Sequence, residues 1–293
     1  MSLAAIARAV GDAAAYLCGM PSAPVPLERT DRAPWVWASA QALRSRVPPA
    51  ALAAALRADD RVEAVATRAD GLLELTLAPA AVCAALLELA SGDGMPPAHL
   101  PVRPAGPGVD AFWLAVTRFE AARTAAGASR LAPRVAARRT LDNPVTVVPL
   151  AQARASRVAR QAAALTGASD FWTAAVASTP AAALSTSATP ALLIDPVAVQ
   201  ALDDPLDLAL LTELLDAPRR LARHQSHPQE VATALLAVAT AYLAWEERCP
   251  AIPTRPGEAT SSRHLARQFV SLAGSSVLER GMAVLGVSAP ERM

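Results

Sequence analysis

The chain has 293 residues, of which 53% are hydrophobic and 18% charged, and its formal net charge is +1. This length supplies enough core for one large domain or two ordinary ones, and the composition is too apolar for a disordered chain. Every one of the 27 basic residues is an arginine, and the lack of lysine excludes a P-loop and Schiff-base catalysis, which both need the lysine amine.

Residues 1–92 are predicted to form a small α+β domain. Two runs rich in Val, Leu and Thr, at 61–68 and 72–78, flank an Asp-Gly turn and predict a β-hairpin or two neighbouring strands. Helical composition surrounds them, and alanine is the strongest helix former. We expect helices at 2–17, 34–46, 50–60 and 79–90.

Residues 93–108 are rich in Pro and Gly and are predicted to be a linker, which makes them the best domain boundary in the chain. Residues 109–293 are predicted to be a helical domain, interrupted by a Ser/Thr/Pro-rich loop at about 178–199. The expected helices lie at 109–127, 150–167, 204–218, from Pro228 onward, and from Thr260 or Ser261 to about Gly286.

Local signals refine these helices. Asn143-Pro144 is expected to end one segment, before a short apolar piece and a helix that starts near Ala151. Asp203-Asp204 before Pro205 is interpreted as a helix cap, and Pro218 is expected to break the helix that follows. After Pro228, apolar residues recur at steps of four, three, four and three, which predicts one buried helical stripe. The stripe consists of Val231, Leu235, Val238, Tyr242 and Trp245.

No arrangement of residues typical of catalysis or metal binding appears in the sequence, so we expect a non-enzyme that uses no cofactor and no metal. The three cysteines, Cys18, Cys83 and Cys249, form neither a CxxC motif nor a disulfide framework, which fits a reducing compartment. Arg8 and Asp12 interrupt the apolar N-terminus, which is unlike a signal peptide. We therefore expect a soluble cytoplasmic protein without a membrane partner.

Arginines are concentrated between Arg118 and Arg160. Nine arginines in this segment are opposed by only Glu120 and Asp142, which leaves a local net charge of +7 in a chain that totals +1. Arginine forks suit phosphate, so the segment is a candidate nucleic-acid surface, although a solvated helical face with internal ion pairs explains the charge equally well. The candidate residues are Arg118, Arg134, Arg138, Arg139, Arg154, Arg157 and Arg160.

Several stretches resemble arginyl-tRNA synthetases. The C-terminal "LGVSAPERM", the preceding "HPQEVATALLAVATAYLAWEERCP" and the lead-in "DNPVTVVPLAQAR" are similar to that family's anticodon-binding (DALR) domain. "GVDAFWLAVTR" is similar to its Asp-Ala-Leu-Arg element, and "PWVWASAQALRSR" with "VEAVATRADGLLELTL" resembles its additional N-terminal domain. The residues of this chain carried over from the family pattern are Asn143, Pro144, Gln152 and Trp245.

The resemblance implies that the chain has the family's two tRNA-binding domains but lacks the catalytic domain that lies between them. The family's catalytic domain would lie where this chain has its Pro/Gly linker, and its lysine-bearing signature is absent here. The chain also departs from the anticodon-binding pattern, because aromatic residues are usual at Thr146, Val147 and Leu150. Aliphatic side chains cannot stack on unpaired bases as aromatic ones do.

Three functions remain open from the sequence. The first is a non-catalytic tRNA-binding paralogue that grips tRNA, an arginine acceptor being one candidate, and presents it to a partner enzyme. The second is a protein-interaction module that has lost RNA binding, which the near-zero total charge favours. The third is a trans-acting subunit that completes a separate arginine–tRNA ligase polypeptide.

Overall fold

The computed structural model describes residues 3–19, 21–30, 33–92, 111–124, 143–166, 196–223 and 227–287. These residues divide into two compact units. The first unit comprises Met1–Glu88 together with Asp195–Ala201, and the second comprises Leu89–Ile194 together with Leu202–Met293. The predicted linker at 93–108 lies outside the described residues.

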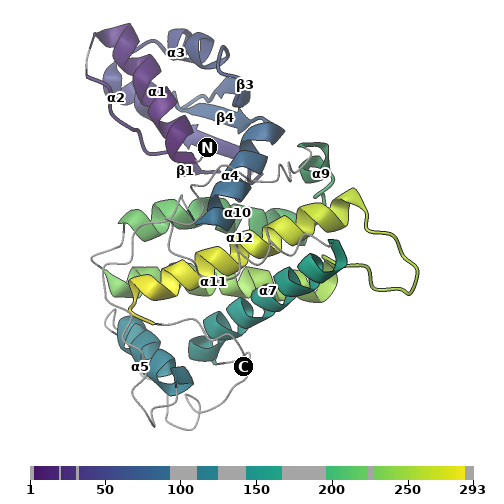
Figure 1. The fold of residues 1–293 in the computed structure, drawn as a ribbon. Coiled ribbons are helices and arrows are strands. Elements are labelled where there is room, and N and C mark those ends of the chain that lie inside the picture. Colours follow the sequence, from purple (N-terminus) through teal and green to yellow (C-terminus); the bar gives the residue numbers. More distant parts are fainter. Residues whose placement is uncertain are drawn as a thin grey trace, which may run out of the picture. The chain divides into compact units, whose positions relative to one another are not determined.

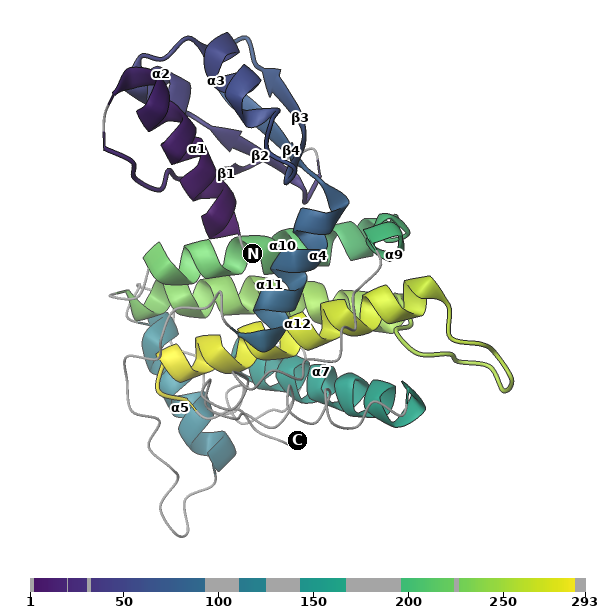
Figure 2. The same cartoon turned by 45° about the horizontal axis from the view of Figure 1, so that its top comes forward.

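The first unit combines short helices with one antiparallel sheet (Figure 2). The strand order is β1-β2-β4-β3, so β4 lies between β2 and β3. Helix α1 packs on α2 and α3, and α3 packs on β3. The elements are α1 (Leu3–Cys18), β1 (Glu28–Arg29), β2 (Val36–Ser39), α2 (Gln41–Ser45), α3 (Pro49–Leu56), β3 (Val62–Thr67), β4 (Leu73–Leu77), α4 (Pro79–Ser91) and α9 (Pro196–Gln200).

The predicted hairpin is confirmed. Strands β3 and β4 pair antiparallel, and their turn is closed by the Arg68 amide, which donates to the Leu72 carbonyl at 2.8 Å. Gly71 has a φ of +80°, a conformation that favours glycine, and the Asp70 side chain accepts from the Leu72 amide at 3.1 Å. The Asp-Gly dipeptide therefore forms the turn that its sequence predicts.

The helix expected at 34–46 is wrong in its first half. Val36–Ser39 is strand β2, which pairs with both β1 and β4, and only Gln41–Ser45 is helical. Trp37 is 1% exposed, and its indole N–H donates to the Pro34 carbonyl at 3.0 Å. Pairing with β4, which lies far along the chain, outweighs the local helical composition.

The second unit is a helical bundle (Figure 1). Helix α11 packs on α5, α7, α10 and α12, while α12 also packs on α7 and α10. The predicted fold class, mainly α with a small α+β part near the N-terminus, is confirmed. The helices are α5 (Ala111–Thr124), α7 (Pro144–Thr166), α10 (Pro205–Arg223), α11 (Pro228–Arg248) and α12 (Ser262–Val284).

Prolines interrupt the bundle helices less than the sequence predicts. Helix α7 starts at Pro144 and runs through Pro149, so the apolar piece after Asn143 forms its first turns. Helix α10 likewise continues through Pro218, where a break was expected. An internal proline costs about 3 kcal/mol. Burial of neighbouring side chains such as Leu214 outweighs that cost.

Other helix predictions are confirmed. All five members of the α11 stripe (Val231, Leu235, Val238, Tyr242 and Trp245) are 0% exposed. Asp204 caps α10, because its side chain accepts from the Leu206 amide at 2.9 Å. Ser261 caps α12 with His264 in a capping box. The loop expected at about 178–199 is corrected at its end, since Pro196–Gln200 is helix α9; residues 178–195 lie outside the described part.

Small residues form the seam between α7 and α12. The buried face of α7 carries alanines, and Ala151, Ala155 and Ala159 are all 0% exposed. Hydrogen bonds cross the seam: the Ser156 and Ser275 hydroxyls lie 3.0 Å apart, and the Ser271 hydroxyl donates to the Ala155 carbonyl at 3.5 Å. Within the described ranges, no helix is both long and apolar enough to cross a membrane.

Candidate nucleic-acid interface

The Asn143-Pro144 pair begins helix α7. The Asn143 side-chain oxygen accepts from the Val145 amide at 3.1 Å, and its carbonyl accepts from the Thr146 and Val147 amides at 3.0 and 3.2 Å. Pro144 occupies the first helical position, where a missing N–H costs nothing. Asn143 is 0% exposed. Both family-pattern residues therefore fix where the helix starts, and the Asn143 side chain is not available to a ligand.

Three arginines lie along the exposed side of α7, and we call Arg154, Arg157 and Arg160 the α7 arginine face. Helix α7 contains no acidic residue. The side chain of Arg154 is 32% exposed and that of Arg157 is 58% exposed, while Arg160 is also exposed. Spacing of three residues places the arginines on one side of the helix, as the sequence predicts.

One carboxylate from α11 joins two of these arginines. Arg154 Nη1 donates to Glu246 Oε2 at 2.8 Å, and Arg157 Nη2 donates to Glu246 Oε1 at 2.9 Å. The Glu246 side chain is only 14% exposed, so it lies beneath the guanidinium groups that it holds. Among the described residues, Arg160 has no ion-pair partner. The three arginines and Glu246 together carry a net charge of +2.

Of the other predicted arginines, the structure describes only Arg118, which lies on a different helix. Arg118, on α5, donates from Nη1 to the Gly286 carbonyl just beyond the C-terminal end of α12. A cation suits that position, because the helix dipole leaves partial negative charge there. Arg118 therefore fastens α5 to α12. Arg134, Arg138 and Arg139 lie outside the described residues.

Gln152 lies inside the bundle. It is 4% exposed, and its Nε2 donates to the Ser156 hydroxyl at 2.9 Å. Its Oε1 is buried without a hydrogen-bond partner. Gln152 therefore joins the polar contacts of the α7–α12 seam instead of facing a ligand.

Trp245 belongs to a buried cluster that sequence reasoning missed. Its indole N–H donates to Asp207 Oδ1 at 2.7 Å, and Arg267 binds both Asp207 oxygens, at 3.0 and 2.7 Å. Burial opposes the charge of Arg267, yet the hydrogen bond and charge of Asp207 raise its pKa. The sequence signal was an acidic residue in the first turn of α10, flanked by Leu206 and Leu208. The cluster ties α10, α11 and α12 together.

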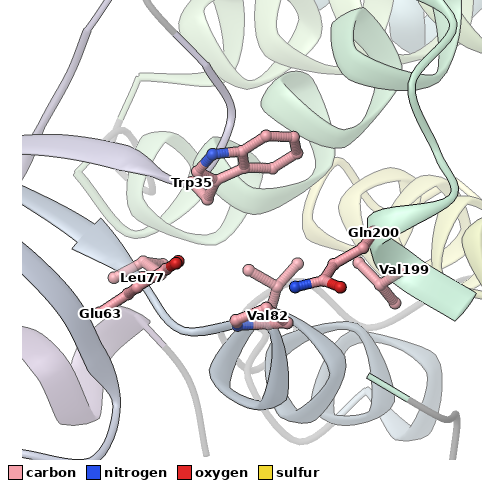
Figure 3. Close-up of a pocket in the computed structure, with 7 residues that line it drawn as sticks. Trp35, Glu63, Leu77, Val82, Val199 and Gln200 are labelled. Carbon is pink, nitrogen blue, oxygen red and sulfur yellow. The ribbon is translucent and has the colours of Figure 1, made fainter. Parts of the chain in front are cut away.

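A pocket of about 160 Å³ lies within the first unit (Figure 3). Its walls are mostly apolar, and the Gln200 amide reaches toward Val82 across it. Glu63 supplies the one carboxylate in the lining, and the lining holds no nucleophilic side chain. The labelled lining residues are Trp35, Glu63, Leu77, Val82, Val199 and Gln200.

The second unit is an all-helical domain with arginines exposed on helix α7. Residues 181–293 match the family model described as the DALR anticodon binding domain. The C-terminal part of the chain is therefore similar to DALR anticodon-binding domains.

The relatives specify the class further. The chain is 32% identical to the arginine–tRNA ligase of Clavibacter sepedonicus over 161 residues, which cover 54% of this chain and 24% of that enzyme. It is 33% identical to the arginine–tRNA ligase of Micrococcus luteus over 159 residues, covering 53% and 24%. The match to the Chlorobium limicola enzyme is 39% over 82 residues, covering 27% and 14%. No solved structure matches the chain.

The chain therefore matches less than a quarter of the length of these curated relatives. The predicted resemblance to arginyl-tRNA synthetases is confirmed for the parts of the chain that these comparisons match.

Proposed function

We propose that this chain is a non-catalytic tRNA-binding protein that contacts the phosphate backbone through the α7 arginine face. An arginine acceptor is the first tRNA to test, because the curated relatives are arginine–tRNA ligases. In this proposal, the chain acts in the cytoplasm and presents its bound tRNA to a partner enzyme.

The match of residues 181–293 to an anticodon-binding family is the observation that carries this proposal. The α7 arginine face supports it, because arginine forks bind phosphate oxygens in pairs and helix α7 has no carboxylate of its own. Arg160 and Arg157 are the exposed members and make the first phosphate contacts. The absence of lysine supports the non-catalytic part, since the family's lysine-bearing signature is not in this chain.

The test is binding of the purified full chain to total tRNA at several salt concentrations, followed by sequencing of the retained tRNA. Phosphate contacts release counterions, so affinity should fall by orders of magnitude between about 50 and 200 mM salt. Arg157→Ala/Arg160→Ala should weaken binding at least about tenfold and lower the salt slope by roughly two.

The matched control is Arg219→Ala/Arg220→Ala on α10, a helix that packs on α11 and α12. Both control arginines are ion-paired, with Asp216 at 2.7 Å and with Glu213 at 2.8 Å. Equal losses in both double variants, or no tRNA binding at low salt, would overturn the proposal. Arginine- and ATP-dependent charging of tRNA by this chain alone would overturn its non-catalytic part.

A second candidate is a protein-interaction module. The sharing of Glu246 between Arg154 and Arg157 favours it, because a face already compensated by one carboxylate needs no polyanion. Under this alternative a protein partner is retained by the chain after nuclease treatment, and tRNA is not.

A further inference from the structure

Glu246 binds two of the three arginines of the α7 arginine face. Both of its carboxylate oxygens are used, one by Arg154 at 2.8 Å and one by Arg157 at 2.9 Å. Among the described residues, neither arginine has another ion-pair partner. We propose that Glu246 is an internal competitor of RNA phosphate, which limits tRNA affinity by holding Arg154 and Arg157 until a phosphate displaces it. This inference rests on the proposed function.

The competition follows from the chemistry of the groups. A carboxylate and a phosphate present similar oxygen acceptors to the same guanidinium donors, so one arginine edge cannot serve both at once. Glu246 also repels a phosphate that approaches its arginines, because the two negative charges would lie within a few ångström of each other.

Burial decides which partner moves. The Glu246 side chain is 14% exposed, whereas that of Arg157 is 58% exposed. A long, exposed arginine side chain can rotate outward with its charge in water, while the carboxylate stays on α11. Solvent screens the pair on its exposed Arg157 side, so the pair is weaker than a fully buried one and an arriving phosphate can replace it. Arg160, which has no ion-pair partner in the described part of the chain, makes the first contact.

The experiment compares tRNA binding by the wild-type chain, Glu246→Gln and Glu213→Gln. Glu213 is a matched control, because its side chain is 16% exposed and pairs with Arg220 on α10 at 2.8 Å. Both substitutions remove one negative charge, so a general gain in positive charge affects them equally. Glu246→Gln should tighten binding roughly tenfold at low salt, and screening should shrink the gain as salt rises. A thermal unfolding curve for each variant confirms that the fold is retained.

A further variant tests whether the gain in tRNA affinity depends on Arg154 and Arg157. In the Arg154→Ala/Arg157→Ala background, Glu246→Gln should no longer tighten binding, because the groups that it releases are gone. The salt slope of Glu246→Gln should also steepen by about one for each additional phosphate contact.

The outcomes separate the two proposals. The tRNA function stands if the wild type binds tRNA and Arg157→Ala/Arg160→Ala weakens that binding. If Glu246→Gln then binds tRNA no better than Glu213→Gln, the proposal that Glu246 competes with phosphate is wrong. Weaker binding by Glu246→Gln would also overturn it. If neither the wild type nor Glu246→Gln binds tRNA at low salt, both proposals fail.

Discussion

Asp207 of α10 accepts hydrogen bonds from Arg267 of α12 through both carboxylate oxygens, and the pair is buried, with side chains 1% and 8% exposed. Removing one partner leaves an uncompensated charge inside the bundle, which costs about 3–5 kcal/mol. We expect Asp207→Asn to lower the unfolding free energy by that amount in urea titrations.

The exposed pair in the same bundle is the control for this loss. Asp203 and Arg263 lie 2.9 Å apart, but their side chains are 72% and 45% exposed. Solvent screens such pairs, so Asp203→Asn should leave the urea midpoint almost unchanged. Equal effects of Asp203→Asn and Asp207→Asn would show that burial does not determine the strength of these pairs.

Gly281 of α12 marks a close helix approach. A Cβ atom there would lie 2.2 Å from Leu235 Cδ2, and Leu235 is fully buried. We expect Gly281→Ala to destabilise the bundle by about 1–3 kcal/mol through overpacking, despite alanine's better helix propensity. Removing the obstruction tests the cause: in a Leu235→Ala background, Gly281→Ala should be neutral or stabilising in thermal unfolding.

Substitution of Arg118 should lower the stability of the fold, whereas substitution of the α7 arginine face should weaken tRNA binding. Arg118→Ala removes the bond to the Gly286 carbonyl and should cost about 1–3 kcal/mol, the range for hydrogen bonds of charged groups. Hydrogen exchange should report faster opening of α5. Arg157→Ala should leave the unfolding curve nearly unchanged, since the Arg157 side chain is 58% exposed and Glu246 keeps its pair with Arg154. A reversed pattern, with Arg118→Ala affecting only tRNA binding, would contradict this division.

The three cysteines should react with thiol reagents at different rates. Burial, with a further contribution from Asp207, raises the pKa of the Cys249 thiol to about 11, and Cys249 is 1% exposed. Because the thiolate is the reactive form, Cys249 stays protonated and unreactive at neutral pH. Cys18 is partly exposed and Cys83 is buried. Labelling followed by mass spectrometry should therefore modify Cys18 first and Cys249 only after unfolding.

Regular local patterns were enough to predict much of the fold. The α11 stripe follows the helical period without interruption, and the hairpin turn is specified by Asp70 and Gly71 within a few residues. Strand β2 was missed because its pairing partner β4 begins at Leu73, far along the chain. The break expected at Pro218 was wrong for the same reason, since the packing that offsets the cost of this proline comes from other helices.

The candidate site was predictable only in part. Spacing of three residues placed Arg154, Arg157 and Arg160 on one side of α7, as the structure has them. Their compensation by Glu246 could not be seen, because 92 positions separate Arg154 from Glu246. Asp207 was missed in the same way, as its partner Arg267 lies 60 positions away.

The α7–α12 seam has few interlocking side chains, since alanine and serine offer little shape to engage. Side-chain packing alone would allow the two helices to shift along their lengths. The hydrogen bonds at Ser275 and Ser271 therefore fix the position of α7 along α12. Such a seam orders few rotamers and costs little side-chain entropy. The register of α7, and with it the position of its arginines relative to Glu246, therefore depends on the hydroxyl groups of Ser156, Ser271 and Ser275.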